Sequence, residues 1–252
     1  MPDRSFKAVV LDLFDTLVKW EPERLPLMEW QGRTIHTTMP WVFPKLEARL
    51  GDKFERNKFI EVYSAVVEEI GVERERDGIE VTCTERFART LRRLMPAPDD
   101  ELYRFAEELT RAHMAGVRAV TFAPPARAAA VRRIAPYYRL GLLSNFDDAQ
   151  CGREVLNDTG VAHLFEAVII SAEVALRKPN PRIYHQILDM LQLEPHQVLF
   201  VGDTPREDVM GPAQIGMHTA WISKDAKPLP EGIPAPRFQL ADLAELPEIL
   251  GV

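Results

Sequence analysis

Five short apolar runs limit what this chain of 252 residues can fold into more than any other feature. They are rich in valine, isoleucine and leucine, which is typical of parallel strands buried on both faces. In chain order the runs are Lys7–Leu13, Leu140–Ser144, Ala167–Ser171, Val198–Val201 and His218–Ile222. Helical patterns follow the second, third and fourth runs, over Arg153–Asp158, Arg182–Leu191 and Asp208–Ile215. Strands that alternate with helices predict an α/β fold with a doubly wound parallel sheet, and Gln239–Leu250 predicts one more short helix.

Between the first and second runs lies a long segment of a different character. It opens with two short runs around Gln31-Gly32, a dipeptide that favours a hairpin turn within Leu27–Thr38. Helical patterns follow in four stretches, Val42–Leu50, Phe54–Ile70, Thr84–Met95 and Asp99–Met114. We therefore predict a helical domain of residues 20–119, inserted into a core formed by residues 1–19 and 120–252.

Charge and composition argue against several classes of protein. The formal net charge is −7 and no segment is densely basic, which argues against a nucleic-acid surface. No apolar run approaches the ~18 residues of a membrane span, and the first residues carry no apolar signal segment. The cysteines Cys83 and Cys151 have no metal-ligand spacing and favour a reducing compartment. We expect a cytoplasmic monomer or homodimer that acts on a small molecule.

Polar residues follow the predicted strands at the points where each strand ends. In an open parallel sheet these ends face the ligand-binding crevice. The residues at these ends or shortly after them are Asp12, Phe14, Asp15 and Thr16 for the first run, Ser144 and Asn145 for the second, Lys178 for the third, and Gly202, Asp203 and Asp208 for the fourth. Clustered carboxylates repel one another unless a cation holds them, and oxygen ligands suit Mg²⁺. The sequence therefore predicts a magnesium site at this edge.

These four segments, in this order, resemble the motifs of the haloacid dehalogenase superfamily, most of whose members are phosphohydrolases. The resemblance covers the whole α/β core, and the helical insert resembles the cap that the family places after its first motif. It implies a Rossmann-like core in which Asp12 is the nucleophile and forms an aspartyl intermediate. Lys178 would neutralise the charge shared by Asp12 and the phosphoryl oxygens.

The resemblance also implies the remaining members of the site. Thr16 and Ser144 would hydrogen-bond the transferred group, and Asn145 would help to orient it. The metal would be held by the carboxylates of Asp12 and Asp203, by that of Asp208 directly or through water, and by the backbone carbonyl of Phe14.

Phe14 is where this chain departs from the family's phosphatases, which carry a second aspartate two residues after the nucleophile. That aspartate protonates the leaving alcohol, and losing a general acid costs about 10²–10⁴-fold for a leaving group that needs a proton. Asp15 is a candidate substitute. In an extended segment, however, residues three apart point to opposite sides, so we expect Asp15 to make a turn or cap contact.

Three hypotheses for the reaction follow. In two of them the nucleophile attacks phosphorus, and in the other it attacks carbon. The first is a Mg²⁺-dependent phosphohydrolase for a small phosphorylated metabolite, slow or specialised for leaving groups that depart without a proton, such as acyl or aryl phosphates. The second is a 2-haloacid dehalogenase, since halide leaves unprotonated, with Arg33 as a candidate substrate-binding arginine. The third resembles phosphonoacetaldehyde hydrolase, which needs a cap lysine, and the candidates are Lys45, Lys53 and Lys58.

The alternative to an enzyme is a binding module. Without its second acid, the protein would recognise a phosphorylated metabolite and turn it over weakly or not at all. The presence of Asp12, Lys178 and Asp203 together argues against this hypothesis, because a binder needs no nucleophile. Among the aromatic residues, Tyr184 is expected to pack in the core, and the core is also the favoured place for the pocket candidates Trp20, Trp30, Trp41 and Phe43.

Overall fold

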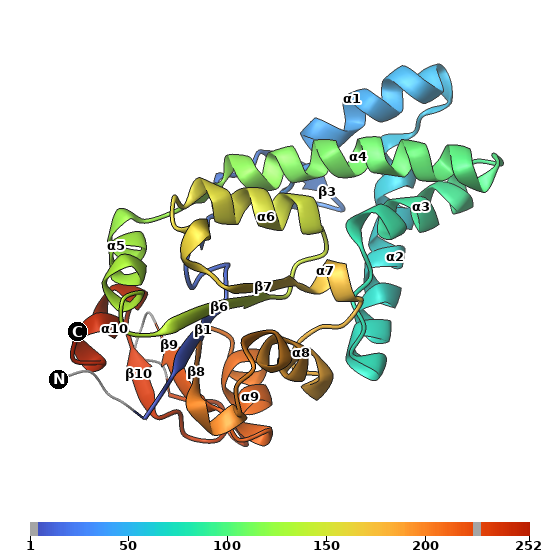
Figure 1. Ribbon diagram of the computed structural model, residues 1–252. Helices are drawn as coiled ribbons and strands as arrows, with labels where there is room; N and C mark the ends of the chain where they lie inside the picture. Colours follow the sequence, from blue (N-terminus) through green and yellow to red (C-terminus); the bar gives the residue numbers. More distant parts are fainter. Residues whose placement is uncertain (1–4, 224–227) are drawn as a thin grey trace. The chain divides into compact units, whose positions relative to one another are not determined.

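The computed structural model describes residues 5–223 and 228–252. The chain divides into two compact units, each drawn in Figure 1. The first unit comprises Met1–Lys19 and Phe122–Val252, and the second comprises Trp20–Thr121. The short strands β2 (Lys19–Trp20) and β5 (Thr121–Phe122) mark the two places where the chain passes from one unit to the other.

The first unit is built on a six-stranded parallel sheet in the order β10-β9-β8-β1-β6-β7. Its strands are β1 (Ala8–Leu11), β6 (Arg139–Ser144), β7 (Ala167–Ile170), β8 (Val198–Gly202), β9 (His218–Ile222) and β10 (Phe238–Leu240). In β1 all four residues are fully buried, because β6 pairs on one side of it and β8 on the other. The sheet order reverses around β1, so the ligand crevice of this fold lies beyond the end of that strand.

Helices cover both faces of this sheet, and Figure 1 shows α6 on one face and α8 and α9 on the other. The contacts are tight: a Cβ on Gly152 of α6 would lie 3.2 Å from Ile170, and one on Gly141 of β6 would lie 3.3 Å from Leu191 of α8. The unit's helices are α5 (Pro125–Ile134), α6 (Ala149–Asp158), α7 (Ser171–Val174), α8 (Pro181–Leu191), α9 (Gly211–Gln214) and α10 (Leu246–Ile249). The predicted doubly wound α/β fold is confirmed.

Several predicted boundaries in this unit were wrong. Strand β1 ends at Leu11, two residues before the predicted end, because pairing with both neighbouring strands stops there. Gln239 and Leu240 belong to strand β10, so the predicted C-terminal helix breaks into that strand and two short turns of helix. Three-residue strands show no periodicity in sequence, and β10 is defined by its pairing with β9. Helix α5 lies outside every predicted element.

The second unit is helical after a hairpin. Strands β3 (Leu27–Trp30) and β4 (Arg33–His36) are antiparallel, and the turn residues Gln31 and Gly32 have φ angles of 47° and 72°. Both lie in the left-handed region that a tight two-residue hairpin turn requires. The helices of the second unit are α1 (Met39–Leu50), α2 (Arg56–Asp77), α3 (Cys83–Leu94) and α4 (Asp99–Ala119). Both α2 and α4 run several residues past their predicted ends.

Aromatic rings form part of the core of the second unit. Phe43 is buried and packs against the rings of Phe54 and Phe59, and Tyr63 joins Phe59 to Phe87. Of the four aromatic residues that were candidates for a pocket, Phe43 is thus in this core, whereas Trp20 is 39% exposed and Trp30 and Trp41 are half-buried. Along the described residues, no helix has the length and apolar character needed to cross a membrane.

Candidate active site

The site begins where β1 ends. The backbone N–H of Asp12 still donates to the carbonyl of Val201 at 2.9 Å, and the chain then turns away from the sheet. The buried Asp12 carboxylate accepts a hydrogen bond from Lys178 Nζ, with 2.9 Å between Nζ and Oδ1. Lys178 Nζ also donates to Asp208 Oδ1 at 2.7 Å. The structure therefore brings together three predicted site residues as one buried cluster of charges.

The charge balance of this cluster depends on the lysine. Burial alone would lower the pKa of Lys178, but the negative charges of Asp12 and Asp208 outweigh it and raise that pKa above its ordinary value. A buried ion needs several partners to offset its lost hydration. Here Lys178 has two carboxylates, and its ammonium lies 5.3 Å from the ring centre of Phe200.

Asn145 positions Lys178. Its side-chain amide donates from Nδ2 to the carbonyl of Lys178 at 2.9 Å, and its Oδ1 accepts from the N–H of Lys178 at 2.8 Å. The residue directly after β6 thus fixes the backbone on which the lysine is carried. The prediction that Asn145 helps to orient the transferred group stays a prediction. What the structure shows is that both atoms of its amide hydrogen-bond the backbone of Lys178.

Asp208 sits on a π-helical turn, Pro205–Met210. Its second carboxyl oxygen accepts from the N–H of Thr204 at 2.8 Å. A Cβ at Gly202 would lie 2.3 Å from Asp208, so only glycine allows the strand to pass this close to the carboxylate. Tyr184 is fully buried, as expected, and its hydroxyl donates to the carbonyl of Glu207 at 2.5 Å, which braces the same turn.

Three carboxylates could hold a metal ion. Each of Asp12, Asp203 and Asp208 offers an oxygen, and the three oxygens lie within 4.8 Å of one another. Burial, followed by the charges of Asp12 and Asp208, raises the pKa of Asp203 to about 8. Repulsion of this kind is relieved by a divalent cation, and carboxylate oxygens are hard ligands. The donor set therefore fits Mg²⁺, and the part of the Phe14 carbonyl stays a prediction.

Two buried hydroxyls, one in the turn after Asp12 and one at the end of β6, have no hydrogen-bond partner among the described residues. Thr16 Oγ1 and Ser144 Oγ are both buried, with Thr16 0% and Ser144 1% exposed. A buried hydroxyl without a partner costs on the order of 1–3 kcal/mol. Such a cost is expected where the partner is a ligand, and both residues were predicted to contact the transferred group.

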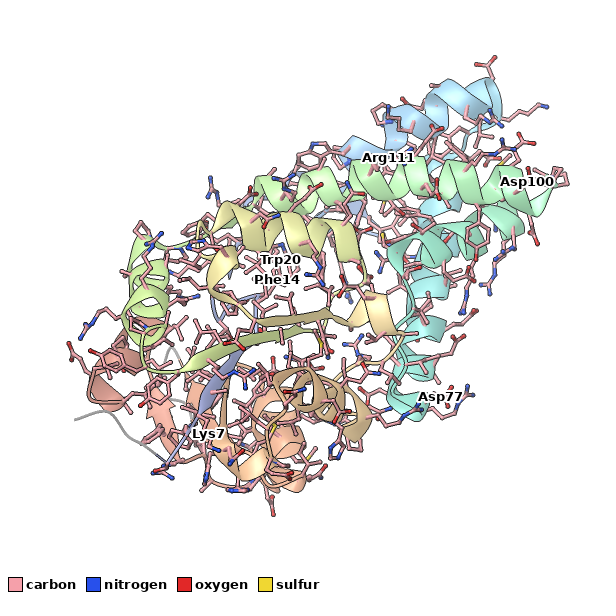
Figure 2. The ribbon with its side chains drawn as sticks, viewed as in Figure 1. Lys7, Phe14, Trp20, Asp77, Asp100 and Arg111 are labelled. Atoms are coloured by element: carbon pink, nitrogen blue, oxygen red, sulfur yellow. The ribbon has the colours of Figure 1, made fainter. Side chains whose placement is uncertain are left out.

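Phe14, which is labelled in Figure 2, pairs with Phe146, a residue that sequence reasoning missed. The ring centres of Phe14 and Phe146 lie 4.6 Å apart. Phe146 follows Asn145, and Ser171 fixes its backbone on both sides: the N–H of Phe146 donates to Ser171 Oγ at 2.8 Å, and that hydroxyl donates to the Phe146 carbonyl at 3.1 Å. In the sequence, the signal for Phe146 is its position directly after Ser144 and Asn145. The side chain that replaces the acid is thus part of an aromatic pair.

Asp15 occupies a turn, as expected, although the reason given for its orientation was wrong. The chain is not extended after Asp12: the N–H groups of Leu17 and Val18 both donate to the carbonyl of Leu13 at 2.9 Å. Asp15 has a φ of 58°, a conformation that aspartate tolerates better than most residues. Its charge contributes to the raised pKa of Asp203, after burial and the other two carboxylates.

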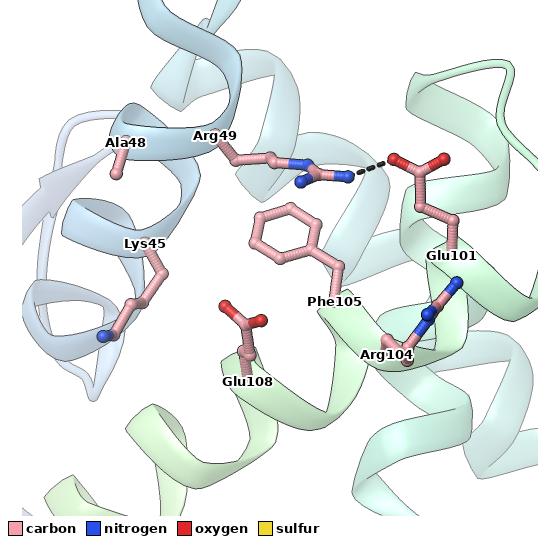
Figure 3. A pocket seen from close by; sticks show the side chains of 7 residues that line it. All are labelled: Lys45, Ala48, Arg49, Glu101, Arg104, Phe105 and Glu108. Atoms are coloured by element: carbon pink, nitrogen blue, oxygen red, sulfur yellow. Dashed lines mark hydrogen bonds and ion pairs between the residues drawn. The ribbon is translucent and has the colours of Figure 1, made fainter.

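The candidates for the alternative chemistries are exposed. Arg33 lies on the solvent side of the hairpin, and Lys45, Lys53 and Lys58 are all exposed. A cavity of about 570 Å³ lies beside Lys45 (Figure 3), lined mainly by charged side chains: Lys45, Ala48, Arg49, Glu101, Arg104, Phe105 and Glu108. Arg49 is paired with Glu101 across it. None of the three lysines has the buried setting that Schiff-base chemistry needs.

Comparison with known proteins decides the family. Residues 6–216 match the family model described as haloacid dehalogenase-like hydrolase. The chain belongs to this family of hydrolases. It is 29% identical to a phosphoserine phosphatase of Thermus thermophilus, over 95% of this chain and 97% of that one. It is 33% identical to an N-acylneuraminate-9-phosphatase of Mus musculus, over 44% of this chain and 45% of that one.

A solved structure confirms the family's fold. The 2-haloacid dehalogenase from Pseudomonas syringae pv. Tomato DC3000 superposes with a TM-score of 0.70, at 20% identity and over 98% of each chain. At this identity the likeness shows the fold alone. The arrangement of a six-stranded parallel sheet with a long helical insertion after β1 is therefore that of the haloacid dehalogenase-like hydrolases.

The raised pKa of Asp203 predicts how stability depends on pH in a chelator. The folded state keeps this proton up to about pH 8, whereas an ordinary aspartate loses it near pH 3.8. Because the folded state binds more protons between these values, the free energy of unfolding falls as the pH rises through this range. Asp203→Asn cannot ionise, so it should lose much of this slope when Tm is measured from about pH 5 to about pH 8.

The exposed Asp189 of α8 offers a matched control. Asp189→Asn should keep the wild-type dependence of Tm on pH. Equal slopes for wild type and Asp203→Asn would contradict the repulsion inferred among the three carboxylates.

Proposed function

We propose that this hydrolase is a Mg²⁺-dependent phosphohydrolase that acts on a small phosphorylated metabolite through Asp12. The observation that supports this proposal is the buried cluster of Asp12, Lys178 and Asp208, together with the buried hydroxyls of Thr16 and Ser144, which have no hydrogen-bond partner among the described residues. A nucleophile, a fixed cation and hydroxyl donors are what transfer of a phosphoryl group needs. The full-length similarity to a protein named phosphoserine phosphatase supports phosphorus as the target.

In the proposed first step, the Asp12 oxygen that Lys178 does not hold attacks phosphorus, and the bond from phosphorus to the leaving oxygen breaks. An aspartyl phosphate results. Lys178 neutralises charge on Asp12 and on the phosphoryl oxygens, and the hydroxyls of Thr16 and Ser144 donate to those oxygens. A water molecule then attacks phosphorus, the bond to Asp12 breaks, and inorganic phosphate leaves.

Asp12, Asp203 and Asp208, with the carbonyl of Phe14, are the groups that would hold Mg²⁺. When bound, the ion supplies positive charge that stabilises the phosphoryl oxygens and favours the ionised form of Asp12. The pKa of Asp12, which burial raises to about 7, makes this contribution matter near neutral pH. The second unit, by the same proposal, is a cap that excludes water and sets the substrate.

The aromatic pair limits the substrate class. Phe14 occupies the position where a phosphatase of this family carries its acid, and its ring packs against the ring of Phe146. Leaving groups that depart as stable anions, such as carboxylates or phenolates, need no such proton. We infer that acyl or aryl phosphates are turned over more readily than alkyl phosphates.

A 2-haloacid dehalogenase is the second candidate, because Phe14 suits a leaving group that is never protonated. In that reaction Asp12 would attack carbon and release halide. Asp203 argues against it, since its carboxylate lies with Asp12 and Asp208 in a cluster that suits a cation. The exposure of Arg33 also leaves this hypothesis without its substrate-binding arginine in the hairpin.

Asp12→Asn tests the nucleophile. We expect hydrolysis of p-nitrophenyl phosphate with Mg²⁺ to fall by at least about 10³-fold while Tm changes little, because the amide has nearly the same shape but cannot form the intermediate. Asp189→Asn, on the exposed side of α8, should retain wild-type turnover. Turnover near wild type in Asp12→Asn would contradict the assignment.

Phe14→Asp tests the missing proton donor. We expect kcat on an alkyl phosphate to rise, within the ~10²–10⁴-fold range of general acid catalysis, while kcat on an aryl phosphate changes less. Asp15→Asn is the companion variant. If Asp15 supplies no proton, this substitution should change kcat by the same factor on both substrates. No gain for Phe14→Asp on the alkyl substrate would contradict the inferred role of the proton.

A further inference from the structure

Arg127 is the largest fully buried side chain of the described residues, and nothing in the proposed chemistry uses it. It lies in the first turn of α5, and its side chain is 0% exposed. Removing a charged group from water costs several kcal/mol unless hydrogen bonds and an opposite charge replace the lost hydration. The partners of Arg127 therefore show what its burial accomplishes.

One side of the guanidinium is held by Asp242, from the C-terminal part of the chain. Nη2 donates to Asp242 Oδ2 at 2.9 Å and Nε donates to the same oxygen at 3.1 Å. Burial alone would raise the pKa of Asp242, but the hydrogen bonds from Arg127 and from the N–H of Ala244 outweigh it and lower that pKa. Asp242 is thus an anion that fixes the orientation of Arg127.

The other side of the guanidinium hydrogen-bonds the loop that follows Asp12, the proposed nucleophile. Nη1 donates to the carbonyl of Asp15 at 3.1 Å and to the carbonyl of Val18 at 3.2 Å. These two carbonyls flank Thr16 and Leu17. The Asp15 carbonyl belongs to the peptide group that it shares with the N–H of Thr16, so Arg127 fixes the plane of that peptide.

This loop needs an anchor. Asp15 has a φ of 58°, in a region that a residue with a side chain occupies at a cost of about 1–3 kcal/mol. The Thr16 hydroxyl is buried and without a partner among the described residues, so its direction is set by the backbone around it. A misplacement of about 1 Å in a positioned group can lower a rate by about 10²-fold.

We propose that Arg127 is a positioning residue, which holds the loop of residues 15–18 so that the Thr16 hydroxyl faces the transferred phosphoryl group, with Asp242 holding Arg127 in place. The role of Thr16 in this inference rests on the proposed function. The contact between Arg127 and the loop does not rest on the proposed function, because hydrogen bonds alone define it.

A double-mutant cycle tests the proposal. Arg127→Lys, Thr16→Val and the double variant are compared by kcat/KM on p-nitrophenyl phosphate with Mg²⁺. Arg127→Lys should lower kcat/KM by about 10–100-fold in the wild-type background and by much less in the Thr16→Val background, since Arg127 acts through Thr16. Equal losses in both backgrounds would overturn the proposal.

Arg133→Met is the matched control, because Arg133 lies on the same helix but is exposed and bonds to the carbonyl of Val252. It should leave kcat/KM unchanged. If Arg127→Lys does not fold, Asp242→Asn takes its place in the cycle: it removes the anion but keeps an oxygen that can accept from Ala244. The same non-additive loss is expected, smaller in size, and additive losses would overturn the proposal.

Hydrogen exchange separates this inference from the proposed function. In Arg127→Lys, peptides covering residues 13–19 should exchange faster, while peptides from β6 and β8 keep their wild-type protection. Unchanged exchange of residues 13–19 would overturn the inference that Arg127 holds the loop. If the wild type hydrolyses no aryl phosphate, the proposed function fails, and this exchange measurement still decides whether Arg127 holds the loop.

Discussion

The buried ammonium of Lys178, shared between Asp12 and Asp208, is the interaction on which the rest of the site depends. Two buried carboxylates this close together would repel, and one lysine hydrogen-bonds both. The surrounding structure serves that arrangement. Asn145 fixes the lysine's backbone, Gly202 makes room for Asp208, and Tyr184 braces the turn that carries Asp208. Catalysis by such a site rests on charges that are in place before the substrate arrives.

Phe14 changes what this arrangement of charges can do. In the proposed function Asp12 is the nucleophile, Lys178 the cation, and Thr16 and Ser144 the hydroxyl donors. Phe14, at the position where the family's phosphatases carry a proton donor, instead pairs with Phe146. On this proposal, stabilisation of the phosphoryl group is kept and assistance to the leaving group is lost. The substrate must then supply a good leaving group, and this links one side chain to the inferred preference for acyl and aryl phosphates.

Local patterns predicted the strands and the residues that end them, because a parallel sheet places those ends along one edge. Asp12, Lys178 and Asp208 could be found in this way. Strand β10 could not, since it is defined by its pairing with β9. Phe146 and Arg127 were missed for the same reason: their partners, Phe14 and Asp242, lie more than a hundred residues away in sequence. Asn145 was found, but its contact with the lysine backbone needed the fold.

The fate of solvent oxygen during turnover tests most directly whether hydrolysis takes place at phosphorus, as proposed, or through an Asp12 ester that is cleaved at carbon. An aspartyl phosphate is cleaved by water at phosphorus, whereas the ester formed by a dehalogenase is cleaved at the Asp12 carbonyl carbon. The enzyme would be turned over in ¹⁸O-labelled water on p-nitrophenyl phosphate and on 2-chloropropionate, and the phosphate and the Asp12-containing peptide would be analysed by mass spectrometry. We expect label in the phosphate released from p-nitrophenyl phosphate, and no label in the Asp12-containing peptide with either substrate. Label in Asp12 together with release of chloride would contradict it.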